Sequence, residues 1–105
     1  MTPALRGPDA GTLLVRALRT MGAAYDVQVE SIAARPWVSA TFVGTRYRVS
    51  LSGPAVPGFR SWLDSLPEAE FALRGHLVAD LAIDSVESIA EGVRATLTVL
   101  TLEDS

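Results

Sequence analysis

The chain contains no cysteine and no lysine, and both absences narrow its chemistry. Without cysteine there is no disulfide bond, no thiolate nucleophile and no sulfur ligand for a metal ion. A chain without cysteine suits the reducing cytoplasm, so we expect a cytoplasmic location. All nine basic residues are arginine, which we interpret as codon usage in a GC-rich genome rather than selection for guanidinium chemistry.

Long apolar runs and an excess of basic charge are also missing. The apolar runs extend over only a few residues, which is too short for a transmembrane helix. Arg16 and Arg19 interrupt the apolar residues near the N-terminus, so this segment predicts an amphipathic helix and not a signal peptide. The net charge of −3 and the pI of about 5.0 lack the electrostatic footprint of nucleic-acid binding. We therefore expect neither nucleic acid nor a membrane as a partner.

Catalytic groups are sparse as well. His76 is the single histidine, and a typical zinc site needs three or four nitrogen, sulfur or oxygen ligands. Asp80 follows His76 by four residues on a predicted strand, a spacing of about 13 Å that is too long for a hydrogen bond. Ser39, Ser50 and Ser52 have no base placed beside them by the sequence. We expect a non-enzymatic protein with no cofactor and no metal.

What the chain does contain is strong alternation of apolar and polar residues. Alternation runs through residues 71–84, which predicts a long strand with one buried face. The length of 105 residues, with 49% hydrophobic and 20% charged residues, is typical of one globular domain. We expect a flexible N-terminal tail at residues 1–8 and a single domain over residues 9–105.

Local signals predict the other elements. Asp9 can cap a helix that ends near Gly22, and Phe59 begins a second apolar helical pattern that Pro67 stops. Strands are predicted at residues 25–33, 37–43, 46–52, 71–84 and 93–102, with a two-residue hairpin turn at residues 43–46 and a solvated acidic connector at residues 84–92.

The predicted order of elements is α-β-β-β-α-β-β, which defines an α+β fold. Two helices should pack on one face of a five-stranded, mainly antiparallel sheet. The residues predicted to form the common core are Phe42, Tyr47, Val49, Leu51, Phe59, Trp62, Leu63, Leu73, Leu77, Leu81 and Leu97.

A group of basic residues falls on the outward phase of the predicted strands. It comprises Arg46, Arg48, Arg74, His76 and Arg94. Clustered guanidinium groups repel one another unless they are paired, and they favour carboxylates or phosphates. They can pair with neighbouring acidic side chains of the sheet, or they can bind an anionic ligand or an acidic partner surface.

Several apolar residues share this outward phase. They are Trp37, Val43, Val78, Leu100 and Leu102. The apolar phase of the last strand flips at Leu100, as a β-bulge or an outward apolar patch would require. If the residues gather, their aromatic and arginine composition is typical of interface centres, and a homodimer is the commonest way to cover such a patch.

Three functions remain open at this point. The first is a small binding or assembly module that self-associates through the outer sheet face or an edge strand. The second is a small anionic-ligand-binding protein or enzyme that uses the arginine-lined face. The third is a chaperone-like module that binds an extended segment of another protein. The predicted element order is similar to that of type III secretion chaperones, although no sequence motif is shared.

Overall fold

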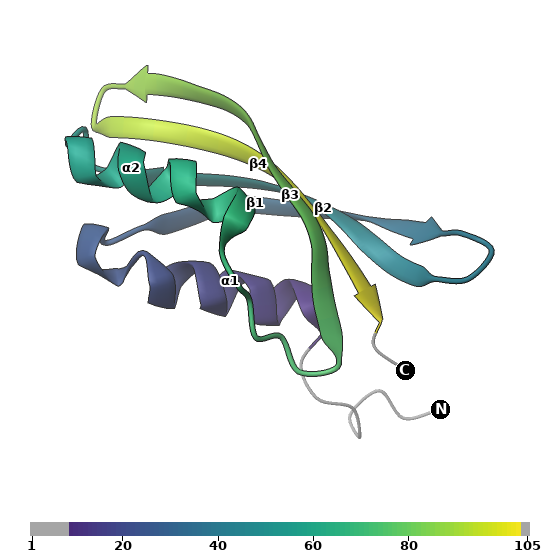
Figure 1. The fold of residues 1–105 in the computed structure, drawn as a ribbon. Helices are drawn as coiled ribbons and strands as arrows, with labels where there is room; N and C mark the ends of the chain where they lie inside the picture. Colours follow the sequence, from purple (N-terminus) through teal and green to yellow (C-terminus); the bar gives the residue numbers. More distant parts are fainter. Residues whose placement is uncertain (1–8, 104–105) are drawn as a thin grey trace.

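The computed structural model describes residues 9–103 and contains one antiparallel sheet with two α-helices on one of its faces (Figure 1). The strands are β1 (Gln28–Val38), β2 (Val43–Gly53), β3 (His76–Ile89) and β4 (Gly92–Glu103), in the spatial order β1-β2-β4-β3. The helices are α1 (Ala10–Met21) and α2 (Pro57–Ser65), followed by short 3₁₀ turns at Ala23–Tyr25 and Leu66–Glu68. The α+β class, the two helices and the antiparallel sheet are confirmed, and the predicted tail lies outside the described residues.

The sheet has four strands and not the predicted five, because β1 joins two segments that the sequence separates at Pro36. β1 is an edge strand, so half of its backbone groups face no neighbouring strand. A proline without an N–H group is therefore tolerated within it. The chain reverses at residues 39–42, where the Ser39 N–H donates to the Phe42 carbonyl oxygen over 2.9 Å.

This later reversal also corrects the predicted hairpin. Gly44 does not form a turn but pairs with Trp37 inside the β1–β2 ladder. Phe42, predicted in the core, instead lies in the reversal with 50% of its surface exposed.

β3 starts later than the alternation suggests, because residues 73–76 form a turn. The His76 N–H donates to the Leu73 carbonyl oxygen over 2.9 Å, and Gly75 adopts a φ of +80°. A positive φ at the third position of a turn is typical of type II and favours glycine. This turn sets the positions of Arg74 and His76.

Two β-bulges then change the phase of β3. The register shifts between Val78 and Asp80 and again between Ile83 and Ser85. Each bulge inserts one extra residue. The two residues that flank it, such as Val78 and Asp80, therefore point to opposite faces, although strict alternation would place them on the same face. Leu77, predicted in the core, therefore faces away from the helices with 45% of its surface exposed.

The predicted acidic connector is replaced by regular structure. β3 continues to Ile89, which pairs with Gly92 at the start of β4. Only Ala90 and Glu91 lie between these paired residues, and Gly92 has a φ of +149°. Residues 84–89 are thus part of the sheet.

The core lies between the helices and one sheet face. The Thr12 N–H donates to the Asp9 carboxylate over 2.8 Å, which caps α1 as predicted. Trp62 is only partly buried and stacks on Phe59, with 5.8 Å between ring centroids. The predicted core residues that are buried are Tyr47, Val49, Leu51, Phe59, Leu63, Leu73, Leu81 and Leu97. No helix within residues 9–103 is long and apolar enough to cross a membrane.

Candidate functional site: the outer face of the sheet

The sheet face opposite the helices, here called the outer face, is covered by no element within residues 9–103. The pairing register determines which side chains it carries. Residues paired across neighbouring antiparallel strands point to the same face. Each set of four residues paired across β1, β2, β4 and β3, in that order, is called a row. Counted from the β1–β2 reversal, the first four rows of the outer face are Trp37–Gly44–Leu102–Leu77, Arg35–Arg46–Leu100–Asp80, Ala33–Arg48–Thr98–Ala82 and Ser31–Ser50–Thr96–Ser85. Gln28, Ser52, Arg94 and Glu87 form a further row at the opposite end.

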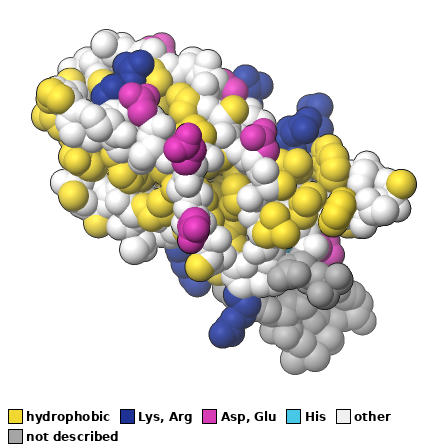
Figure 2. Space-filling view, in the orientation of Figure 1, with side chains coloured by type: hydrophobic (Ala, Val, Ile, Leu, Met, Phe, Trp, Pro, Cys, Tyr) yellow, Lys and Arg dark blue, Asp and Glu magenta, His cyan; other side chains and the backbone are white. Residues whose placement is uncertain are grey.

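The first row, called the apolar row, makes one end of the outer face hydrophobic. A Cβ atom at Gly44 would collide with the Thr101 carbonyl oxygen and would lie 3.0 Å from Leu102 Cδ2. Trp37 and Leu102 therefore flank a position that admits no side chain of its own. Leu100 follows in the next row. In Figure 2, hydrophobic side chains gather near the β1–β2 reversal, with basic side chains beside them.

The apolar residues predicted for this face are only partly brought together. Trp37, Leu100 and Leu102 lie on it, and Leu77 joins them because of the bulge at residue 79. Val78 does not, since it pairs with buried Thr101 on the helix side. β4 pairs with β2 without a register shift, so the phase flip at Leu100 is an outward apolar patch and not a bulge.

Val43 is the second residue that the structure removes from the predicted patch. It pairs with Val38 one position before Gly44, so both valines point toward the helix side of the sheet. Val43 and Val38 are 50% and 70% exposed, because they lie near the end of the hairpin.

Three arginines form a cluster on β1 and β2 of the outer face. Arg46 and Arg48 were expected there, and Arg35 joins them because β1 continues through Pro36. Arg35 and Arg46 are direct cross-strand partners, an arrangement that destabilises a sheet when both residues carry the same charge. None of the three forms an ion pair with a carboxylate of residues 9–103.

Arg94 is part of a separate ion-paired group at the other end of the face. Its Nε donates to Glu30 Oε1 over 2.7 Å, and its Nη1 lies 3.6 Å from Glu87 Oε1. The hydrogen bond from Arg94 lowers the pKa of the Glu30 carboxyl below its ordinary value. The alternative that these basic residues pair with neighbouring acidic side chains of the sheet therefore applies to Arg94.

Carboxylates lie along β3, on the opposite side of the outer face from the arginine cluster. Asp80 occupies the row of Arg35 and Arg46, two strands away from Arg46. The Thr98 hydroxyl donates to Asp84 Oδ2 over 2.5 Å, which holds this bulge residue against the outer face. The outer face is consequently basic along β1 and β2 and acidic along β3.

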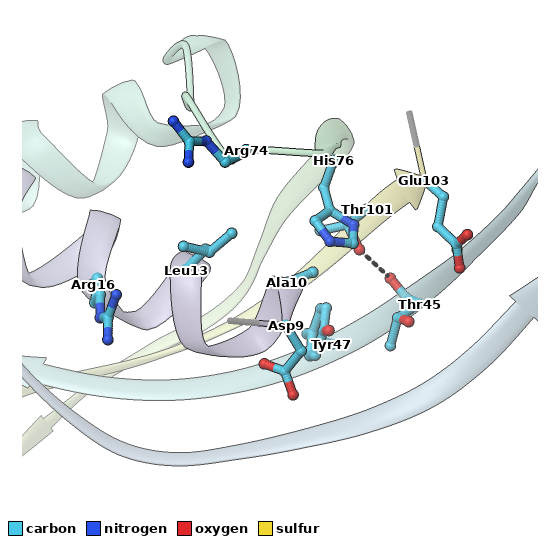
Figure 3. A pocket seen from close by; sticks show the side chains of 11 residues that line it. Asp9, Ala10, Leu13, Arg16, Thr45, Tyr47, Arg74, His76, Thr101 and Glu103 are labelled. Atoms are coloured by element: carbon cyan, nitrogen blue, oxygen red, sulfur yellow. Dashed lines mark hydrogen bonds between the residues drawn. The ribbon is translucent and has the colours of Figure 1, made fainter. Parts of the chain in front are cut away.

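Arg74 and His76, predicted on the outer face, lie on the helix side. The turn at residues 73–76 and the bulge at residue 79 place His76 opposite Glu103, on the face that also carries Thr101. Both basic residues line a cavity of about 620 Å³ between the start of α1, the start of β2 and the end of β4 (Figure 3).

The polar groups of this cavity are of mixed charge, and two of them are hydrogen-bonded within the chain. Arg16, Arg74 and His76 line it together with Asp9 and Glu103. Asp9 caps α1, and the buried Thr101 hydroxyl donates to the Thr45 carbonyl oxygen over 3.3 Å. Figure 3 shows His76 beside Thr101 and Thr45, with Arg16 on the far side of Leu13. This arrangement selects no particular ligand chemistry.

Metal binding also finds no support in the described part of the chain. Within residues 9–103, no group of three or more histidine, aspartate or glutamate side chains is arranged to hold a metal ion. Comparison with known proteins found no family model, no curated protein and no solved structure that matches this chain.

Proposed function

We propose that the protein is a cytoplasmic, non-enzymatic binding module that self-associates as a homodimer through its outer face. The observation that carries this proposal is the distribution of charge on that face. Four arginines, namely Arg35, Arg46, Arg48 and Arg94, share it with four carboxylates, namely Glu30, Asp80, Asp84 and Glu87. The two signs lie mainly on opposite sides, so a second copy offers a matching surface.

The size of the face supports a specific contact. Four strands spaced by about 4.8 Å give a width of roughly 19 Å, and ten residues of strand give a length of roughly 33 Å. Two such faces would bury on the order of 1,300 Å² in total, which is at the lower end of specific interfaces. Trp37, Leu100 and Leu102 supply apolar contacts at one end of this face.

The sheet edges are less suited to pairing than the face. β1 contains Pro36 and a register shift between Val29 and Ser31, and β3 contains two bulges. Prolines and bulges are devices that disfavour the addition of another strand at an edge. The edges therefore support neither strand-to-strand dimerisation nor a chaperone-like capture of an extended segment. The anionic-ligand alternative is weakened too, since Arg74 and His76 lie on the helix side and Arg94 is paired.

The test is the molar mass in solution, measured by light scattering over a range of protein concentrations. We expect the natural protein to be a dimer and Trp37→Arg to be a folded monomer, because the new charge would be buried in the apolar row. Val43→Arg is the matched control. Val43 lies beside Gly44 at the same end of the sheet but points to the helix side, so this variant should remain dimeric.

Two results would contradict the proposal. The first is a natural protein that is a monomer at every concentration. The second is a Trp37→Arg variant that dimerises as tightly as the natural protein. Circular dichroism of both variants establishes that they are folded.

A further inference from the structure

We infer that the twofold axis of this dimer runs parallel to β2 and β4, so that Arg35 of one copy faces Asp80 of the partner subunit. The inference rests on the proposed self-association and specifies its partner contacts. When two identical faces stack, the twofold axis lies in the plane between them. It can run along the strands or across them. An axis along the strands places each row over the same row of the partner subunit, with β1 of one copy over β3 of the other. An axis across the strands reverses the order of the rows.

The apolar row favours the axis along the strands. In that arrangement Trp37 meets Leu77 of the partner subunit, and both copies bury their hydrophobic end in the same place. An axis across the strands would set the apolar row against the row that contains Arg94 and Glu87. Burying an ion-paired group against Trp37 would cost desolvation energy without a compensating partner.

The charges favour the same axis. With the axis along the strands, the row of Arg35, Arg46, Leu100 and Asp80 meets its own copy in reverse order, so Arg35 lies over Asp80 of the partner subunit. Arg48 then lies over Thr98 of the partner subunit, whose hydroxyl holds the Asp84 carboxylate. An axis across the strands through the middle row would instead bring Arg48 against Arg48 of the partner subunit.

The arrangement also offsets a repulsion that exists within each copy. Arg35 and Arg46 are direct cross-strand partners without an ion-paired carboxylate among the described residues. Asp80 of the partner subunit would supply the missing negative charge, and the twofold axis supplies it to both copies at once. Charge pairs of this kind contribute more to the register of an interface than to its overall affinity.

The experiment uses the charge-reversed variants Arg35→Asp and Asp80→Arg, separately and mixed in equal amounts. Each variant alone places like charges against each other, so we expect its dimer to dissociate at least about tenfold more readily than the natural dimer. In the heterodimer of the two variants, both contacts between positions 35 and 80 join opposite charges. Native mass spectrometry should therefore show a heterodimer in preference to either homodimer.

A second pair of samples separates this contact from a general effect of charge. Arg60→Asp adds a negative charge on α2, where Arg60 forms an ion pair with Asp64 at 3.7 Å, and leaves the outer face unchanged. It should therefore dimerise as the natural chain does, and in a mixture with Asp80→Arg it should form its own homodimer in preference to the heterodimer. A chain that carries both Arg35→Asp and Asp80→Arg should dimerise as the natural chain does, which also establishes that each position tolerates the opposite charge.

The possible failures are distinguishable. A natural protein that is monomeric at every concentration overturns the proposed function and this inference together. A dimeric natural protein whose two variants dimerise unchanged and mix without preference overturns the inference alone and leaves the outer face as the interface.

Discussion

At the scale of single residues, Asp9 shows how one side chain determines where an element begins. Its carboxylate accepts the N–H of Thr12 and so satisfies a backbone donor that the first turn of α1 leaves unpaired. This hydrogen bond, with a smaller contribution from His76, lowers the pKa of Asp9 below its ordinary value of 3.8. The charged carboxylate is therefore the form that stabilises the fold.

We expect Asp9→Ala to reduce the free energy of unfolding by about 1 kcal/mol at neutral pH, because the cap is lost. The folded-state pKa is lowered, so the contribution of Asp9 is complete above pH 3.8 and disappears as the pH falls through the folded-state pKa. Urea titrations of both proteins at pH 7 and at about pH 2.5 measure the difference. An equal difference at both pH values would contradict this account.

At the scale of elements, the two ends of α1 were predictable from a few neighbouring residues, and the features that depend on strand neighbours were not. The cap at Asp9 and the end of α1 at Gly22 follow from local backbone chemistry. Pro36 predicts the end of a strand, because proline is tolerated within a strand mainly at the edge of a sheet. The edge position of β1 depends on the strand order, which the sequence does not give.

The candidate site was predictable to the same extent. Trp37, Leu100 and Leu102 follow from alternation alone, and so do Arg46 and Arg48. Alternation assigns the first residues of β3 to the wrong faces, because a bulge carries no sequence signature as clear as that of a turn. Leu77 and His76 consequently exchange the faces that the sequence assigns to them, and Arg35 is missed together with the continuation of β1.

Pro36 gives a prediction that belongs to the element. Pro36→Val should keep the fold and change the free energy of unfolding by less than about 1 kcal/mol, since the residue is exposed on an edge strand. It should also aggregate faster, because a continuous β-branched edge invites pairing with another chain. Turbidity over time measures the rate. Pro67→Val, in the 3₁₀ turn after α2, is the control, and equal rates for both variants would argue against a protective role of Pro36.

At the scale of the whole molecule, the proposed dimer is a four-layer assembly in which two sheets are enclosed by helices on both outer sides. Each copy already covers one sheet face with α1 and α2 (Figure 1). The second copy would cover the other face at the sheet separation of about 10 Å that sandwiches use. The cavity near His76 lies on the helix side and would remain accessible from solvent in such a dimer.

Association of this kind couples stability to concentration. The midpoint of thermal unfolding should rise by about 3 °C for each tenfold increase in the concentration of the natural protein, because the dimer unfolds to separate chains. The midpoint of Trp37→Arg should be independent of concentration. Calorimetry at several concentrations makes the comparison, and a constant midpoint for the natural protein would count against a dimer.

The facing arginines at positions 35 and 46 have a consequence for how this sequence can change over evolution. Natural sequences are minimally frustrated, and the conflicts that persist tend to mark function. A neutral residue at position 35 would relieve the conflict within one chain and, in the proposed dimer, remove the attraction of Arg35 for Asp80 of the partner subunit. Selection for stability of the isolated chain and selection for pairing therefore act on position 35 in opposite directions.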